Sequence, residues 1–187
     1  GIHAVYRNAS LNNLGQASYA ALQFDGAHLF KTGGTPGGNG GVTGDNVARP
    51  VMADDGYSVL RLGAATGGRL LRLPFSVFPT ETFANTAAGF AALGHPSISD
   101  DGRTIVFYGD LTSTNLAAAL GTTVGPGMFA YFTDTRSTIR IASLLNTNDP
   151  ASSQITAFYS EERPSVNNLG TIVFLGNNES GQKAIFS

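Results

Sequence analysis

A short polar turn that closes on glycine, with apolar runs on both sides, occurs four times along this chain of 187 residues. The turn glycines are Gly15, Gly56, Gly102 and Gly170. Asn or Asp lies one or two residues before each glycine. Such side chains accept hydrogen bonds from nearby backbone amides, while glycine takes the positive φ that closes a hairpin loop. The repeat constrains the fold strongly, because one such hairpin cannot bury its apolar face without neighbours.

The spacing of the turns predicts units of similar size. The first two intervals between turn glycines are 41 and 46 residues and the third is 68. A propeller blade takes roughly 40 to 50 residues, so the third interval predicts an insertion. After two of the turns, residues 104–109 and 171–176 read TIVFYG and TIVFLG, with apolar side chains on both faces of the expected strand. A strand buried on both faces is expected between neighbouring sheets, as in a propeller.

Further elements follow each hairpin. Third strands are predicted at residues 27–31, 69–73, 127–133 and 183–187, and a fourth strand at 137–144. Two short inserted helices are predicted, at residues 80–94 from apolar spacing and at 112–122 from Thr114 or Asn115 as cap and Gly121 as stop. The glycine-rich residues 32–46 predict a loop; a cation or phosphate cradle built from its amides is the alternative.

The repeated unit resembles the blades of TolB-like β-propellers. Residues 96–107, PSISDDGRTIVF, fit that family's pattern well, and residues 164–174, PSVNNLGTIVF, fit it with Asn in place of Asp. The second copy is looser, and the first lacks the proline. The resemblance implies an all-β fold, a small β-propeller of about four blades made of sequential antiparallel meanders. It implies no activity, because members of that family bind proteins, sit in front of peptidases or have no known activity.

We expect residues 1–187 to form a single β-propeller domain. The blades expected from the repeat are residues 9–47, 48–94, 95–162, and 163–187 together with 1–8. In this interpretation residues 2–7 pair with 183–187 and close the ring, which removes free sheet edges. The alternatives are a fragment of a larger propeller and two chains that form one eight-bladed ring. Because the chain begins at Gly1 and not at Met, we expect a leader or a tag to have been removed.

Composition excludes several classes of partner. Charged residues make up 13% of the chain, the formal net charge is −2, and Lys and Arg are scattered singly, so a nucleic-acid partner is not expected. No apolar run approaches the roughly 20 residues of a membrane span, so membrane insertion is not expected either. Without cysteine, and without a His-x-His or His-Glu-x-x-His spacing, we predict no metal and no cofactor. A cysteine-free chain of this kind is compatible with a secreted, periplasmic or cell-surface location.

Three residues at one position of the repeat are candidates for ligand binding. Arg49, His95 and Arg163 each lie directly before a repeated proline. Equivalent positions converge around a ring, so these side chains could bind an anion; alternatively, each bonds the acidic turn of the neighbouring blade. Tyr159 is the fourth candidate. The paired acids of the second and third turns, Asp54–Asp55 and Asp100–Asp101, are expected to form the turns.

Acid–base chemistry has three candidates: Glu161, Glu162 and Asp110. Adjacent residues of an extended chain point in opposite directions, so Glu161 and Glu162 cannot form a catalytic pair. One of them could work with Asp110 or Asp134, as in propeller glycosidases; a solvated loop or a salt bridge to Arg163 is the alternative. We therefore expect a non-catalytic extracytoplasmic module that binds a protein or a glycan through its loops. Such a module could also form a homo-oligomer or serve as a building block of a surface layer or filament. The alternative is a polysaccharide hydrolase or lyase.

Overall fold

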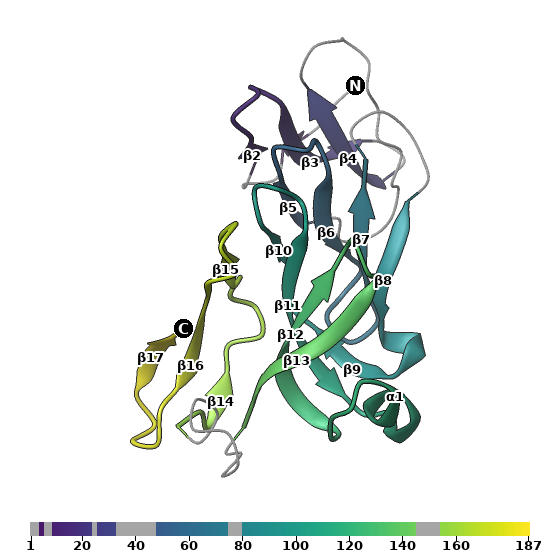
Figure 1. Ribbon diagram of the computed structural model, residues 1–187. Helices are drawn as coiled ribbons and strands as arrows, with labels where there is room; N and C mark the ends of the chain where they lie inside the picture. Colours follow the sequence, from purple (N-terminus) through teal and green to yellow (C-terminus); the bar gives the residue numbers. More distant parts are fainter. Residues whose placement is uncertain (1–3, 6–8, 24–25, 33–47, 75–79, 145–153) are drawn as a thin grey trace.

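A computed structural model (Figure 1) describes residues 4–5, 9–23, 26–32, 48–74, 80–144 and 154–187. Four antiparallel sheets follow one another along the chain. The predicted all-β class is therefore confirmed. Within the described residues, no helix has the length and apolar character needed to cross a membrane.

The bounds of the strands follow the order of the sheets. The first sheet contains β1 (Ala4–Val5), β2 (Ser10–Leu11), β3 (Ala17–Gln23) and β4 (Gly26–Thr32). The second contains β5 (Ala48–Met52), β6 (Ser58–Leu62), β7 (Arg69–Leu73) and β8 (Glu81–Asn85). The third contains β9 (Phe90–Leu93), β10 (Ser97–Ile98), β11 (Thr104–Leu111), β12 (Gly125–Phe132) and β13 (Ser137–Ser143). The fourth contains β14 (Ala157–Phe158), β15 (Ser165–Val166), β16 (Ile172–Asn177) and β17 (Lys183–Phe186).

The first strand of each sheet is either interrupted or bulged near its middle. In the first, third and fourth sheets two short strands pair with one edge of the same long strand: β1 and β2 with β3, β9 and β10 with β11, and β14 and β15 with β16. In the second sheet β5 is continuous but bulges between Ala48 and Val51. The repeated proline lies at these interruptions, where an unpaired backbone tolerates its missing N–H.

The core lies between the sheets. One cluster joins Ala20 of the first sheet to Leu60 and Leu71 of the second. The next, between the second and third sheets, contains Val59, Leu70, Phe107 and Phe129, and the last, between the third and fourth, contains Val106, Met128 and Phe174. Successive residues of β11 thus enter different cores, which confirms the prediction that this strand is buried on both faces.

The repeated turns are linked to one another. The Asn13 backbone N–H donates to Asp54 Oδ1 at 2.9 Å, and its side-chain amide donates to Oδ2 at 2.7 Å. The Asp54 N–H donates to the Asp100 carbonyl at 2.7 Å, and the Asp101 N–H to Asn168 Oδ1 at 2.9 Å. Polar turn residues therefore both shape their own hairpin and connect it to the next one.

One of the two predicted helices is absent. Residues 80–94 form β8, a short 3₁₀ turn at Thr86–Ala88, and β9. The prediction was wrong because an isolated short helix is marginal, whereas these strands gain pairing partners: β8 completes the second sheet and β9 begins the third. The second helix is confirmed as α1 (Thr114–Ala119), but its cap is Ser113, whose hydroxyl accepts from the Leu116 N–H at 3.2 Å. Gly121 follows α1 with a φ of +62°.

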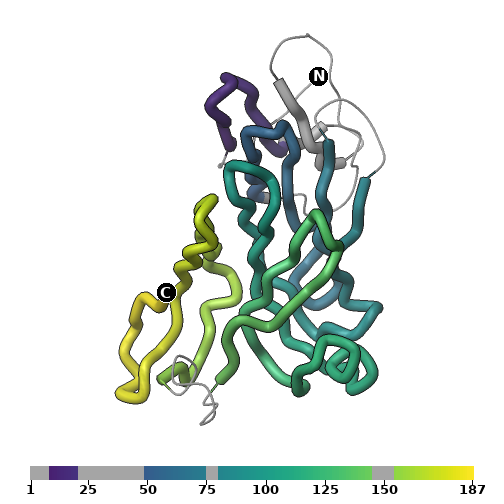
Figure 2. Tube along the Cα trace, viewed as in Figure 1, coloured from purple at the N-terminus to yellow at the C-terminus, as the bar shows by residue number. Residues whose placement is uncertain are grey.

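The N-terminal strand does not close a ring, contrary to the prediction. Ala4 and Val5 pair with Leu22 and Ala21 of β3, and among the described strands β17 pairs with β16 alone. The reason is length: β2 covers only the first residues of the seven-residue β3, and β1 continues along the same edge. The four sheets form an open arc, with the first and fourth sheets at its two ends (Figure 2). Most of the glycine-rich loop, residues 33–47, lies outside the described residues.

Candidate functional site

The interruptions of the first strands bring together charged side chains from three sheets. Arg49 and Arg61 come from the second sheet, His95 from the link between β9 and β10, and Glu161 and Arg163 from the link between β14 and β15. We call these five residues the arginine cluster. Three of them, Arg49, His95 and Arg163, are the residues that the repeat predicted to converge.

Arg61 and Glu161 form the centre of the cluster. Arg61 Nη1 lies 3.3 Å from Glu161 Oε1, and Nη2 lies 3.3 Å from Oε2, so the planar guanidinium faces both carboxylate oxygens. Nη1 also donates to the Leu93 carbonyl at 3.0 Å. The Arg61 side chain is 10% exposed and that of Glu161 60% exposed, so a buried cation meets a carboxylate that reaches solvent.

The other two arginines also connect the second sheet to the fourth. Arg49 Nη1 donates to the Glu161 carbonyl at 3.0 Å, and Arg163 Nη2 donates to the Arg49 carbonyl. Arg49 has a φ of +53°, a left-handed conformation that is uncommon for residues other than glycine. The bulge in β5 holds this conformation and directs the Arg49 carbonyl and side chain to the fourth sheet.

A close backbone approach positions Glu161. Glu161 lies in a turn in which the Glu162 N–H donates to the Tyr159 carbonyl at 3.1 Å. Gly94 packs against this turn: a Cβ on Gly94 would lie 2.5 Å from the Ser160 carbonyl oxygen and 2.9 Å from Tyr108 Cβ. Only glycine therefore lets the third sheet approach the turn closely enough for Glu161 to reach His95 and Arg61.

The cluster carries more positive than negative charge. Burial, followed by the charges of Arg61 and Arg49, lowers the pKa of His95 to about 4, so its imidazole is neutral at pH 7. Its Nε2 lies 3.4 Å from Glu161 Oε2. Burial acts to raise the pKa of Glu161, but the hydrogen bond and charge of Arg61 outweigh it and the pKa is lowered. Burial and then Arg49 lower the pKa of Arg163 to about 10, so this guanidinium is still charged at pH 7. The cluster thus contains three guanidinium groups and one carboxylate.

The remaining candidate residues lie outside the cluster. Tyr159 donates its hydroxyl to Asn177 Oδ1 at 2.8 Å, and Lys183 Nζ lies 4.6 Å from the centre of its ring. Glu162 pairs with the same lysine at 3.8 Å. Asp110 lies on β11. Burial raises the pKa of Tyr108, and the charge of Asp110 raises it further. The structure thus gives Glu161 and Glu162 separate cationic partners, and in the described part of the chain no three His, Cys, Asp or Glu side chains gather as metal ligands.

Arg61 was missed by the sequence analysis, although a signal for it exists. It is the one charged residue of β6, a strand whose five residues are all buried. A cation inside a strand with two buried faces needs a carboxylate or carbonyl partner. That requirement predicts a partner for Arg61, but the sequence does not say which acid or carbonyl provides it.

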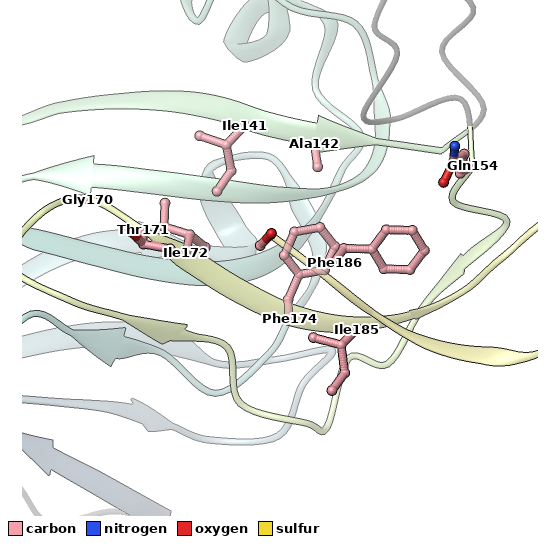
Figure 3. Close-up of a pocket in the computed structure, with 10 residues that line it drawn as sticks. Ile141, Ala142, Gln154, Gly170, Thr171, Ile172, Phe174, Ile185 and Phe186 are labelled. Atoms are coloured by element: carbon pink, nitrogen blue, oxygen red, sulfur yellow. The ribbon is translucent and has the colours of Figure 1, made fainter.

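A separate apolar cavity of 690 Å³ lies between β13 and the strands β16 and β17 (Figure 3). Ile141 and Ala142 line one side, and Phe174 and Phe186 the other. Small-molecule sites usually combine apolar walls with converging polar groups. The polar side chains that line this cavity are few: Gln154, Thr171 and Ser187.

Comparison with solved structures identifies the architecture. The chain has a TolB-like fold. TolB from Acinetobacter baumannii superimposes with a TM-score of 0.62 at 12% sequence identity, over 100% of this chain and 41% of that chain. The chain therefore spans less than half the length of this solved relative, and the likeness is one of fold alone. No family model matches the sequence, and no curated protein does.

Proposed function

We propose that this chain is a non-catalytic recognition module, working outside the cytoplasm, that binds an acidic segment of a partner protein at the arginine cluster. The observation that carries the proposal is the grouping of three arginines with one acidic side chain, that of Glu161. The Glu161 carboxylate faces Arg61, while Arg49 donates to the Glu161 backbone carbonyl and Arg163 to the Arg49 backbone carbonyl. Arginine is suited to this role because its planar fork binds carboxylates through two parallel hydrogen bonds.

Glu161 supports the proposal as an internal stand-in for the ligand. Its carboxylate sits on the Arg61 fork at 3.3 Å, a long distance for a charge-assisted hydrogen bond, and it is well exposed. A carboxylate from a partner can therefore replace it without burying a new charge. The excess of positive charge in the cluster favours such an anion.

The donors of the cluster are not fully used. Arg61 Nε and Arg163 Nε are buried and lack a hydrogen-bond partner in the described residues. An unpaired buried donor costs about 1 to 3 kcal/mol. Two such donors at one place are expected where a site is arranged for binding at some cost in stability.

A protein ligand is favoured over a glycan because glycan sites generally offer an aromatic face. Tyr159 is the aromatic candidate nearest in sequence to the cluster, and its ring is covered by Lys183. A glycosidase also needs a carboxylic acid whose pKa is raised. The pKa of Glu161 is lowered, which does not suit a general acid.

Binding of a fluorescent oligoglutamate peptide at low salt, measured by anisotropy, tests the proposal. We expect Arg49→Gln to weaken binding about tenfold, the loss of one charge-assisted hydrogen bond. Arg103→Gln is the matched control, because Arg103 is an exposed arginine whose ion pair with Asp134 lies away from the cluster. An oligoglutamine peptide that binds equally well would overturn the proposal, and stronger binding of a polyuronate would show that the ligand is a glycan.

A further inference from the structure

The two ends of the arc expose apolar positions whose counterparts in the second and third sheets are buried. Each sheet has a leading face, which packs on the next sheet along the chain, and a trailing face, which packs on the previous one. In each sheet the strand after the repeated turn and the next strand along the chain both contribute side chains to the leading face. Corresponding pairs are Val59 and Leu70 in the second sheet, Val106 and Met128 in the third, and Val173 and Ile185 in the fourth.

Burial separates the fourth sheet from the others. Val59, Leu70 and Val106 are fully buried and Met128 is 3% exposed, because the next sheet covers them. Val173 is 37% exposed and Ile185 is 73% exposed. Figure 3 shows Phe174 and Phe186 directed at the third sheet, whereas Ile185, which also lines the cavity, extends from the other side of β17. The fourth sheet therefore carries a leading face of the same apolar type with nothing described upon it.

The first sheet has the converse feature on its trailing face. Leu11 pairs with Ala17 and is 71% exposed. Its counterparts are Met52 in the second sheet and Ile98 in the third, and both are buried against the preceding sheet. One end of the chain thus presents a free leading face and the other a free trailing face, which are the two halves of the interface that the chain forms internally.

The turns carry the same polarity. Backbone N–H groups of one turn donate to a side-chain oxygen of the next, from Asn13 to Asp54 and from Asp101 to Asn168. At the ends of the series, no hydrogen bond within the described residues uses the Asn168 N–H or Asn13 Oδ1. The last turn therefore retains a donor, and the first turn retains the matching acceptor.

We propose that copies of this chain associate head to tail, with the leading face of the fourth sheet in one copy packed on the trailing face of the first sheet in another. The contact repeats the internal one: Val173 and Ile185 of one copy cover Leu11 of the next, and the Asn168 N–H reaches Asn13 Oδ1. Such an interface joins two different surfaces, so it generates closed rings or open chains of subunits.

The oligomeric state of the intact chain tests this. By analytical ultracentrifugation we expect a mass above the 19.4 kDa of one chain that rises with concentration. Ile185→Lys blocks the leading face and Leu11→Lys blocks the trailing face, so each variant alone should be monomeric. An equimolar mixture of the two should form a dimer that grows no further, because one intact leading face and one intact trailing face remain.

The mixture also serves as the folding control, since misfolded variants could not restore a defined dimer. Ile139→Lys is the matched surface variant: Ile139 is 44% exposed on β13, away from both end faces, and its substitution should leave the mass unchanged. A monomeric intact chain at millimolar concentration would overturn the proposal. So would a Leu11→Lys chain that still dimerises, because that result requires two identical faces in contact.

Discussion

The guanidinium of Arg61 and the carboxylate of Glu161 face each other across two 3.3 Å contacts, although the residues belong to the second and fourth sheets. The same guanidinium donates a hydrogen bond to the Leu93 carbonyl of the third sheet at 3.0 Å. One buried side chain thus ties three successive sheets together at the point where their first strands are interrupted. The proposed binding site and the stability of the arc are therefore coupled.

We expect Arg61→Lys to destabilise the protein far more than Glu161→Gln. Lysine keeps the charge but cannot donate to two carboxylate oxygens and a carbonyl in one plane, and each lost hydrogen bond of a charged group costs about 1.5 to 3 kcal/mol. Glu161 is largely exposed, so its neutralisation should cost less than about 1 kcal/mol. Urea unfolding midpoints measure both. Equal losses would show that Arg61 does not depend on its fork geometry.

Stability should fall as the pH drops from about 6.5 towards 4, and His95 is the expected cause. The folded protein holds the pKa of His95 at about 4, against 6.5 for an ordinary histidine. Between these values the unfolded chain binds a proton that the folded protein refuses, so acid favours unfolding. The full effect is on the order of 3 kcal/mol and is present above pH 6.5. His95→Gln should flatten the fall in melting temperature over this range; an unchanged slope would assign it to other groups.

The repeat made much of this fold predictable, and its failures have physical causes. Position within the repeat placed Arg49, His95 and Arg163 together because equivalent positions of stacked sheets converge. A helix was wrongly predicted at residues 80–94 because apolar residues at helical spacing can also lie on strands, and only tertiary pairing decides between the two. Arg61 and Glu161 could not be paired from sequence, since a contact between sheets two units apart depends on the curvature of the arc.

The turn glycines should differ in their tolerance of alanine. Gly102 and Gly170 both have left-handed φ values, +74° and +81°, so alanine at either costs about 1 to 2 kcal/mol. Around Gly170 the space is open, whereas a Cβ on Gly102 would meet Asp55 Oδ2. Asp55 would have to move and lose its 2.9 Å hydrogen bond from the Tyr57 N–H, for about 1 kcal/mol more. Gly102→Ala should therefore melt earlier than Gly170→Ala; the reverse order would contradict the contact between the two turns.

Alanine at Gly94 should open the arginine cluster. The added Cβ would lie 2.5 Å from the Ser160 carbonyl oxygen, so the turn that carries Glu161 must move away from the third sheet. Such overpacking costs about 1 to 3 kcal/mol. Because burial is the main reason for the low pKa of His95, the movement should let solvent in and raise that pKa from about 4 towards 6.5. An NMR titration of the imidazole measures this directly.

Gly67→Ala is the matched control for Gly94→Ala, because a Cβ at Gly67 meets nothing within 4 Å. It should change neither the melting temperature nor the titration of His95. If Gly94→Ala lowers the melting temperature while the pKa of His95 stays near 4, the turn has adjusted without exposing the imidazole. In that case Gly94 is required for the packing of the third and fourth sheets, and the low pKa of His95 does not depend on it.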